Sequence, residues 1–298
     1  MGFQQPPEKL EPCWRMCRLG TAILCLVSFT VLGCNVRDAK PVPRPEPPNY
    51  VTLLGVTGPN APNELLIEWG RRQLAQRSES LEADEEVIKR IESAESFDCL
   101  PYTMTDELKR ALVQGPRLKW LKADRKASAD DLEWIVKLEL RGLSLAGADL
   151  QNADLGVLRK LDELQWLNLA GTKLPPSGKG LPHLPKLEVL FLDESGSDDY
   201  LPAPGQFPKL KALGLRFSTV TDDGLKKLVE ANAKLRYLNV AGVQGVTSRS
   251  IPVLGKLQLL EYLHVGNTEL ERESYSVQDD TIPELQRLLP KCYIGVGS

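Results

Sequence analysis

One phrase, Leu-x-x-Leu-x-Leu or a close variant of it, occurs six times in this chain. Its copies begin at Ile135, Leu164, Leu187, Leu210, Leu235 and Leu260, and the last five starts are separated by 23, 23, 25 and 25 residues. A period of this length predicts a solenoid, in which each unit buries its apolar side chains only against its neighbours. Such an array presents a long surface and does not usually enclose a catalytic pocket.

The end of each phrase has the pattern of a strand with one buried face. In Leu167-Asn168-Leu169, apolar and polar residues alternate, so the two leucines point to one side. The inward leucines are expected to stack into a continuous core, and each contributes about 1.5–3 kcal/mol to the folded state. The interval from Ile135 to Leu164 is longer and contains "AGADLQNADL", which resembles two pentapeptide repeats. We interpret it as a local similarity to that pattern and not as a second solenoid, because two quintets make less than one full coil.

Three segments, "LQWLNLAGTKL", "LKALGLRFSTVTDDGLKKL" and "LRYLNVAGV", resemble leucine-rich repeats. The similarity is to bacterial repeats of the T/V-T-D-x-G-L type, and Leu288–Ile294 resembles the closing "aLPxCxI" of that family. The resemblance covers roughly residues 118 to 296. It implies an α/β fold, a leucine-rich-repeat solenoid whose curved parallel sheet carries helices or turns on its convex side.

The segments between the strands differ from coil to coil. Thr221-Asp222-Asp223 predicts a helix start, and the apolar residues that follow have helical spacing. The segment "LPPSGKGLPHLP" has too much proline and glycine for a long helix. Where many leucine-rich repeats have a turn-closing Asn, this chain has Thr172, Ser195, Ser218, Val243 and Thr268. A hydroxyl can still bond the backbone there, whereas valine cannot, so we expect a looser or hydrated coil at Val243.

Residues 1–33 have the features of a lipoprotein signal peptide. Arg15 and Arg18 precede an apolar run that ends in Val31-Leu32-Gly33-Cys34, which resembles a lipobox. The resemblance implies that Cys34 receives the lipid and that cleavage falls before it. Translation from Met16 would give a more typical signal, and the competing interpretation is an uncleaved anchor, although the apolar run is short for a span of about 20 residues.

The remaining chain divides into three parts. Residues 34–50 are rich in proline and predict an extended linker that holds the folded part away from the membrane. Residues 51–115 predict a helical N-terminal cap, with Thr105 as an N-cap and Gly115 at a helix end. The alternative for this part is a separate ligand-binding module. Residues 116–298 form the predicted solenoid.

The residues give little indication of catalysis. Neither His183 nor His264 has a Cys, Asp or Glu at metal-ligand spacing, and no phosphate-binding loop or nucleophile elbow is present. We therefore expect no enzyme activity, no cofactor and no metal. The pI of about 5.7 and the lack of a basic, aromatic-rich stretch argue against a nucleic-acid partner. Cys99 and Cys292 lie at opposite ends of the array, so we expect buried free thiols and no disulfide.

The concave face of the sheet is the predicted binding surface. The candidate residues, which flank the strand leucines, are Trp120, Trp166, Asn168, Phe191, Asp193, Arg216, Tyr237, Asn239, Tyr262, His264 and Tyr293. Aromatic residues gather toward both ends of this row, with small residues between them. Exposed Trp and Tyr anchor many interfaces. In the competing interpretation these aromatics favour strands and simply stack along the ladder.

The sequence thus predicts a lipid-anchored protein of the bacterial cell envelope, on its periplasmic or surface side. Its partner would be a protein or another envelope component that binds the concave sheet. Two alternatives remain: a structural spacer without a specific ligand, and an accessory subunit of an envelope enzyme.

Overall fold

The computed structural model describes residues 82–297, apart from 101, 124–125, 177–179 and 275–280. The predicted signal peptide, Cys34, the predicted linker and the first part of the predicted cap lie outside this range. Within it, no helix is long and apolar enough to cross a membrane.

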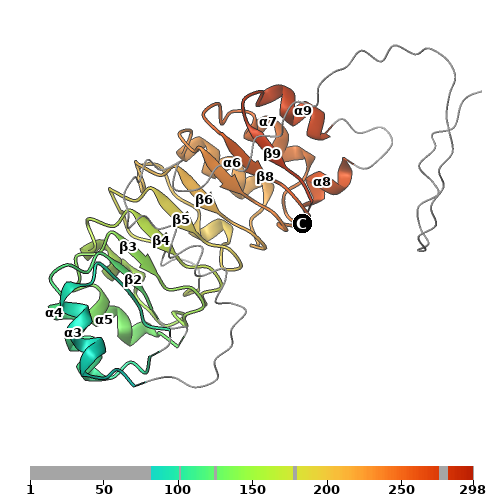
Figure 1. Cartoon of the computed structure of the whole chain (residues 1–298). Helices are drawn as coiled ribbons and strands as arrows, with labels where there is room; N and C mark the ends of the chain where they lie inside the picture. Colours follow the sequence, from blue (N-terminus) through green and yellow to red (C-terminus); the bar gives the residue numbers. More distant parts are fainter. Residues whose placement is uncertain (1–81, 101, 124–125, 177–179, 275–280, 298) are drawn as a thin grey trace, which may run out of the picture. The chain divides into compact units, whose positions relative to one another are not determined.

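One parallel sheet organises the described residues, and its strands follow one another in chain order (Figure 1). The strands are β1 (Ser96–Asp98), β2 (Trp120–Lys122), β3 (Gly142–Ser144), β4 (Trp166–Asn168), β5 (Val189–Phe191), β6 (Ala212–Gly214), β7 (Tyr237–Asn239), β8 (Tyr262–His264) and β9 (Tyr293–Gly295). Each strand is three residues long and pairs in register with the next, so its central apolar residue lies beside the central residue of its neighbours. This is a leucine-rich-repeat solenoid, as predicted.

The central strand residues and the leucines at either end of each phrase form one continuous core. Short helices close the same core from the return segments. They are α5 (Leu132–Ile135), α6 (Asp222–Ala231), α7 (Ile251–Leu254), α8 (Glu269–Glu273) and α9 (Thr281–Leu288), with 3-10 turns η1 (Ala129–Asp131), η2 (Leu155–Lys160), η3 (Asp198–Tyr200) and η4 (Ser248–Ser250). The α6 prediction is confirmed: the Thr221 side chain caps it by accepting a hydrogen bond from the Gly224 amide. The segment after Thr172 contains no helix within its described residues, also as predicted.

The first part of the described chain contains two helices and a strand. Helices α3 (Glu85–Ser93) and α4 (Asp106–Gln114) bury Ile91, Leu108 and Leu112 in the core. Thr105 caps α4, as expected from the sequence. However, β1 lies between the helices and pairs with β2, so the sheet begins inside the segment expected to be helical. The β1 coil lacks the leucine phrase, since Phe97 pairs with Leu121 and Cys99 follows where the later phrases have a second leucine or valine.

The coil around β3 differs from the sequence interpretation. The phrase taken to begin at Ile135 is not a strand, because Ile135 ends helix α5. The strand lies five residues later, where Leu140, Leu143 and Leu145 take the three leucine positions. This shift removes the apparent irregularity, since the interval from Leu140 to Leu164 matches the other periods.

Two of the five residues that replace asparagine tie their turn to the preceding coil, whereas the Thr268 hydroxyl bonds the Val265 carbonyl of its own coil and the buried Ser218 hydroxyl has no partner among the described residues. The Thr172 hydroxyl donates to the Leu145 carbonyl at 2.9 Å, and the Ser195 hydroxyl donates to the Leu169 carbonyl at 2.8 Å. Val243, whose side chain has no hydrogen-bonding group, is completely buried in the core. The looser or hydrated coil expected there stays a prediction. Cys99 and Cys292 are both free and buried, which confirms the expectation of no disulfide.

Candidate functional site

The face of the sheet opposite the leucine core is here called the open face. It carries the residues on either side of each central strand residue, because successive side chains of a strand point to opposite faces. All the predicted strand candidates, from Trp120 to Tyr293, lie on this face, and Asp193 and Arg216 follow β5 and β6 at the strand ends. The sequence thus placed the candidates on a common surface.

A first aromatic group spans β2 to β5. The rings of Trp120 and Trp166 meet edge to face with centroids 6.4 Å apart, and Trp166 and Phe191 do so at 6.0 Å. Gly142 makes the first contact possible, since an added Cβ there would lie 1.8 Å from the Trp120 ring. The Trp120 ring therefore leans across β3 to reach Trp166. These edge-to-face pairs each contribute about 0.5–1.5 kcal/mol beyond their buried area.

A second aromatic group spans β7 to β9. Tyr262 stacks on Tyr237 with centroids 4.9 Å apart and on Tyr293 at 5.5 Å. Tyr237 is only 2% exposed and Trp166 only 7%, although both point away from the leucine core. The assumption that the whole row is exposed is wrong for these two side chains, because they pack against their neighbours along the ladder. Tyr262, Tyr293, Trp120 and Phe191 remain half-buried.

The side chains of the two candidate asparagines form hydrogen bonds with the backbone. The Asn168 side-chain oxygen accepts a hydrogen bond from the Ala170 amide at 2.9 Å, and the Asn239 side-chain oxygen accepts one from the Ala241 amide at 3.0 Å. Both side chains are buried. Each thus closes the turn that follows its strand, and each is too buried to contact a binding partner directly.

Two polar groups with altered pKa values, Asp193 and His264, follow β5 and end β8, on either side of Arg216 in the order of the coils. Burial raises the pKa of the Asp193 carboxyl to about 6, against the opposing effects of a hydrogen bond from the Arg216 amide and of the Arg216 charge. That hydrogen bond is 2.8 Å long. Burial and the Arg216 charge also lower the pKa of His264, which favours its neutral form. Arg216 itself is exposed, and its guanidinium carbon lies 5.5 Å from the centroid of the Phe217 ring.

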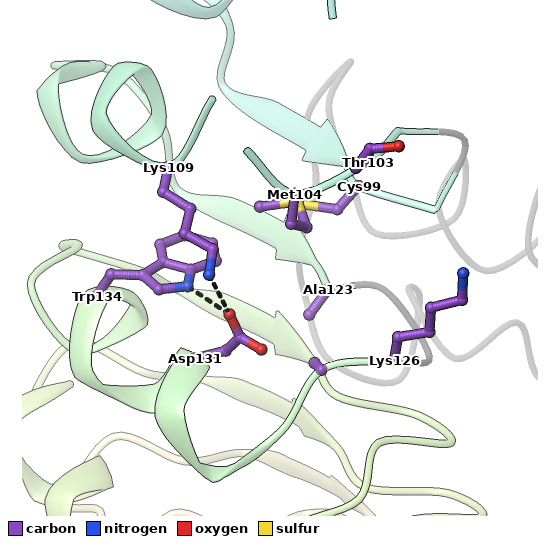
Figure 2. Close-up of a pocket in the computed structure, with 9 residues that line it drawn as sticks. Cys99, Thr103, Met104, Lys109, Ala123, Lys126, Asp131 and Trp134 are labelled. Atoms are coloured by element: carbon purple, nitrogen blue, oxygen red, sulfur yellow. Dashed lines mark hydrogen bonds and ion pairs between the residues drawn. The ribbon is translucent and has the colours of Figure 1, made fainter. Parts of the chain in front are cut away.

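A cavity of about 260 Å³ lies at the N-terminal end of the sheet, beside β1 and β2 (Figure 2). In Figure 2, Lys109 and Trp134 both point to Asp131, whose carboxylate accepts hydrogen bonds from the Lys109 ammonium at 2.9 Å and the Trp134 indole at 3.0 Å. The Ser128 amide donates to the same carboxylate. Burial tends to raise the pKa of Asp131, but these three donors outweigh it and lower the pKa overall. The Lys109 ammonium thus balances the charge of the Asp131 carboxylate, and the contact joins α4 to the η1 turn.

The described residues do not form a site with evident catalytic chemistry. Among them, no group of three or more His, Cys, Asp and Glu side chains is placed to hold a metal ion. Burial raises the pKa of the Cys292 thiol to about 12, so this thiol is a poor nucleophile. Sequence reasoning missed Phe217 and the Asp131 cluster. Phe217 could have been found from its place at a turn that three other coils fill with glycine, whereas the Asp131 cluster gave no local signal.

The parallel sheet with one strand per coil defines the fold as a leucine-rich-repeat solenoid. No protein-family model matches the sequence, and no curated protein matches it significantly. Two solved structures with some similarity are a chain of the mouse RP105/MD-1 complex and an internalin (inlF) from Listeria monocytogenes. The first is 16% identical with a TM-score of 0.41, over 62% of this chain and 36% of that one. The second is 16% identical with a TM-score of 0.39, over 74% of this chain and 80% of that one.

Proposed function

We propose that this protein is a membrane-tethered interaction scaffold that binds a protein or another cell-envelope component through the open face of its sheet. The observation that supports this most is the arrangement of that face. Half-buried aromatic rings lie there in one register, over a core that holds their backbones in place, and the exposed Arg216 follows β6 beside them. Aromatic and arginine side chains on a rigid frame are the types that dominate interface energies.

The tether rests on the sequence alone. Cys34 ends the lipobox-like segment, and the proline-rich residues 34–50 would extend the folded part from the membrane. Replacing Cys34 with Ser removes the thiol that is acylated. We expect the wild-type chain in the membrane fraction and C34S in the soluble fraction, and incorporation of a labelled fatty acid into the wild type alone. Equal labelling of both would refute the anchor.

Site-specific photo-cross-linking tests the binding face. A photoreactive amino acid at Phe191 or Tyr262 reports on the open face, and the same group at Lys227, exposed on α6, is the matched control. In intact cell envelopes we expect one cross-linked partner from the two open-face positions and none of it from the helix. If the open-face positions capture nothing, or capture the same species as Lys227, the scaffold function fails.

A structural spacer without a specific ligand is the second candidate. One observation favours it: Trp166 and Tyr237 are buried by stacking, so part of the aromatic row stabilises the sheet itself. This function predicts that the folded chain supports envelope integrity even when the exposed open-face residues are changed. Complementation of a deletion strain by such a variant would separate the two functions.

A further inference from the structure

Every described coil from β3 to β8 turns at the same place, four residues after its central leucine. The residue there has a positive φ in all six coils: Gly147, Gly171, Glu194, Phe217, Gly242 and Asn267, with φ between 51° and 78°. Glycine adopts this conformation at no steric cost and asparagine tolerates it. A bulky aromatic residue in this region is a clear outlier, and such strain costs about 1–3 kcal/mol. Phe217, with φ of 51°, is the bulkiest of the six.

The sequence at this turn is nearly constant in three of the six coils. It reads Ser-Leu-Ala-Gly after β3, Asn-Leu-Ala-Gly after β4 and Asn-Val-Ala-Gly after β7, counted from the last strand residue. After β5, β6 and β8 it reads Phe-Leu-Asp-Glu, Gly-Leu-Arg-Phe and His-Val-Gly-Asn. The turn itself therefore does not require Glu194 or Phe217, and these two larger residues stand in adjacent coils.

The neighbouring coils are adapted to the larger side chains. An added Cβ at Gly214 would lie 2.5 Å from Phe191 Cδ1 and 2.8 Å from Asp193 Oδ1. An added Cβ at Gly242 would lie 2.2 Å from Phe217 Cδ1. In each case a bulky side chain packs over a glycine of the following coil. The surface around Phe191 and Phe217 is therefore held in place by contacts with the next coil.

Phe217 and its neighbour Arg216 are exposed to solvent. The Phe217 side chain is 52% exposed and Arg216 is exposed beside it. Among the described residues, no carboxylate lies within ion-pair distance of the Arg216 guanidinium, whereas Lys122 pairs with Asp98 at 3.0 Å and Lys211 with Glu188 at 2.8 Å. The exposed Arg216 guanidinium thus lies, without an ion-pair partner among the described residues, next to the exposed ring of a residue with a strained backbone.

We propose that Arg216 and Phe217 form the centre of a docking site for a protein segment that carries one acidic residue next to an apolar side chain. The inference rests on the scaffold function proposed above and specifies its partner. A guanidinium binds a carboxylate through two parallel hydrogen bonds, and the Phe217 ring supplies apolar contact area beside it. Glu194 and Asp193 lie on the preceding coil and repel further acids, so a single carboxylate fits better than an acidic tract.

The first test asks whether Phe217 serves folding. Phe217→Gly in the full-length chain removes the side chain and suits the positive φ. We expect its melting temperature to be unchanged or raised, because relief of the backbone strain offsets the missing packing of the ring over Gly242. A clear fall in melting temperature would mean that the ring is retained for stability, and the inference would then be overturned.

The second test uses a displayed library of random 12-residue peptides, selected on the full-length chain in detergent and counter-selected on the double variant Arg216→Gln/Phe217→Gly. We expect the enriched peptides to pair one Asp or Glu with a nearby apolar residue, and to bind the double variant at least about tenfold more weakly. Arg249→Gln, which removes an exposed arginine of η4, is the matched control and should bind normally.

Peptides that lack an acid, bind both proteins equally, or fail to enrich at all would overturn the inference. The cross-linking experiment distinguishes this failure from failure of the scaffold function. A partner captured at Phe191 and still bound by the double variant would retain the scaffold function and reject the docking site, whereas an open face that captures nothing would reject the scaffold function itself.

Discussion

The packing of Phe217 over Gly242 gives a quantitative test of how the coils are adapted to each other. Gly242 has a φ of 75°, and an added Cβ there would overlap the Phe217 ring at 2.2 Å. Gly242→Ala therefore has two costs. An alanine at positive φ costs about 1 kcal/mol relative to glycine. The overlap adds about 1 kcal/mol, the low end of overpacking costs, because the half-exposed Phe217 ring can rotate away.

The expected loss of unfolding free energy is thus about 2 kcal/mol in the wild-type background. In a Phe217→Gly background the overlap disappears and about 1 kcal/mol remains. The double-mutant cycle should therefore give a coupling energy of about 1 kcal/mol. Urea unfolding followed by tryptophan fluorescence measures all four proteins, provided that their transitions have equal slopes.

Gly171→Ala is the matched control. Gly171 occupies the equivalent turn with a φ of 63°, but an added Cβ there would meet its nearest atoms only at 4.0 Å. It should cost about 1 kcal/mol in either background. If Gly242→Ala and Phe217→Gly prove additive within about 0.5 kcal/mol, the packing of the Phe217 ring over Gly242 is refuted as an energetic contact.

Three further predictions concern titration, coil coupling and thiol chemistry. Because the pKa of Asp193 is raised to about 6 from 3.8, the folded state takes up protons between these values, and this carboxyl makes folding less favourable as pH rises from about 4 to 6. Asp193→Asn should remove this dependence and stabilise the protein at neutral pH by about 1–2 kcal/mol, after a discount for solvent screening. The prediction is wrong if the difference in melting temperature between the variant and the wild type is the same at about pH 4.5 as at about pH 7.5. Asp222 accepts hydrogen bonds from the Thr247 amide at 2.9 Å and its hydroxyl at 2.7 Å, so Asp222→Ala should cost about 1–3 kcal/mol and speed amide exchange in η4, while the exposed neighbour Asp223→Ala should not. Cys292, with its pKa near 12, should resist alkylation at about pH 8 until urea unfolds the chain, and rapid labelling of the native protein would show that the thiol is accessible.

Local patterns in the sequence determined much of this protein. The spacing of the leucines identified the solenoid and most of its strands, because each coil repeats the same burial requirement. Thr105 and Thr221 identified their helix starts, since a cap satisfies backbone donors only a few residues away. The proline-rich segment after Thr172 excluded a helix for an equally local reason.

Contacts between coils decided the rest. Ile135-Leu138-Leu140 and Leu140-Leu143-Leu145 both fit the leucine phrase, and only pairing with β2 and β4 selected the second. The burial of Trp166 and Tyr237 depends on which rings lie beside them in neighbouring strands. Likewise, Phe217 can lie over its turn because residue 242, 25 positions later, is a glycine. A single coil's sequence fixes what it must bury, but the residue alongside in the next coil determines which side chains remain exposed.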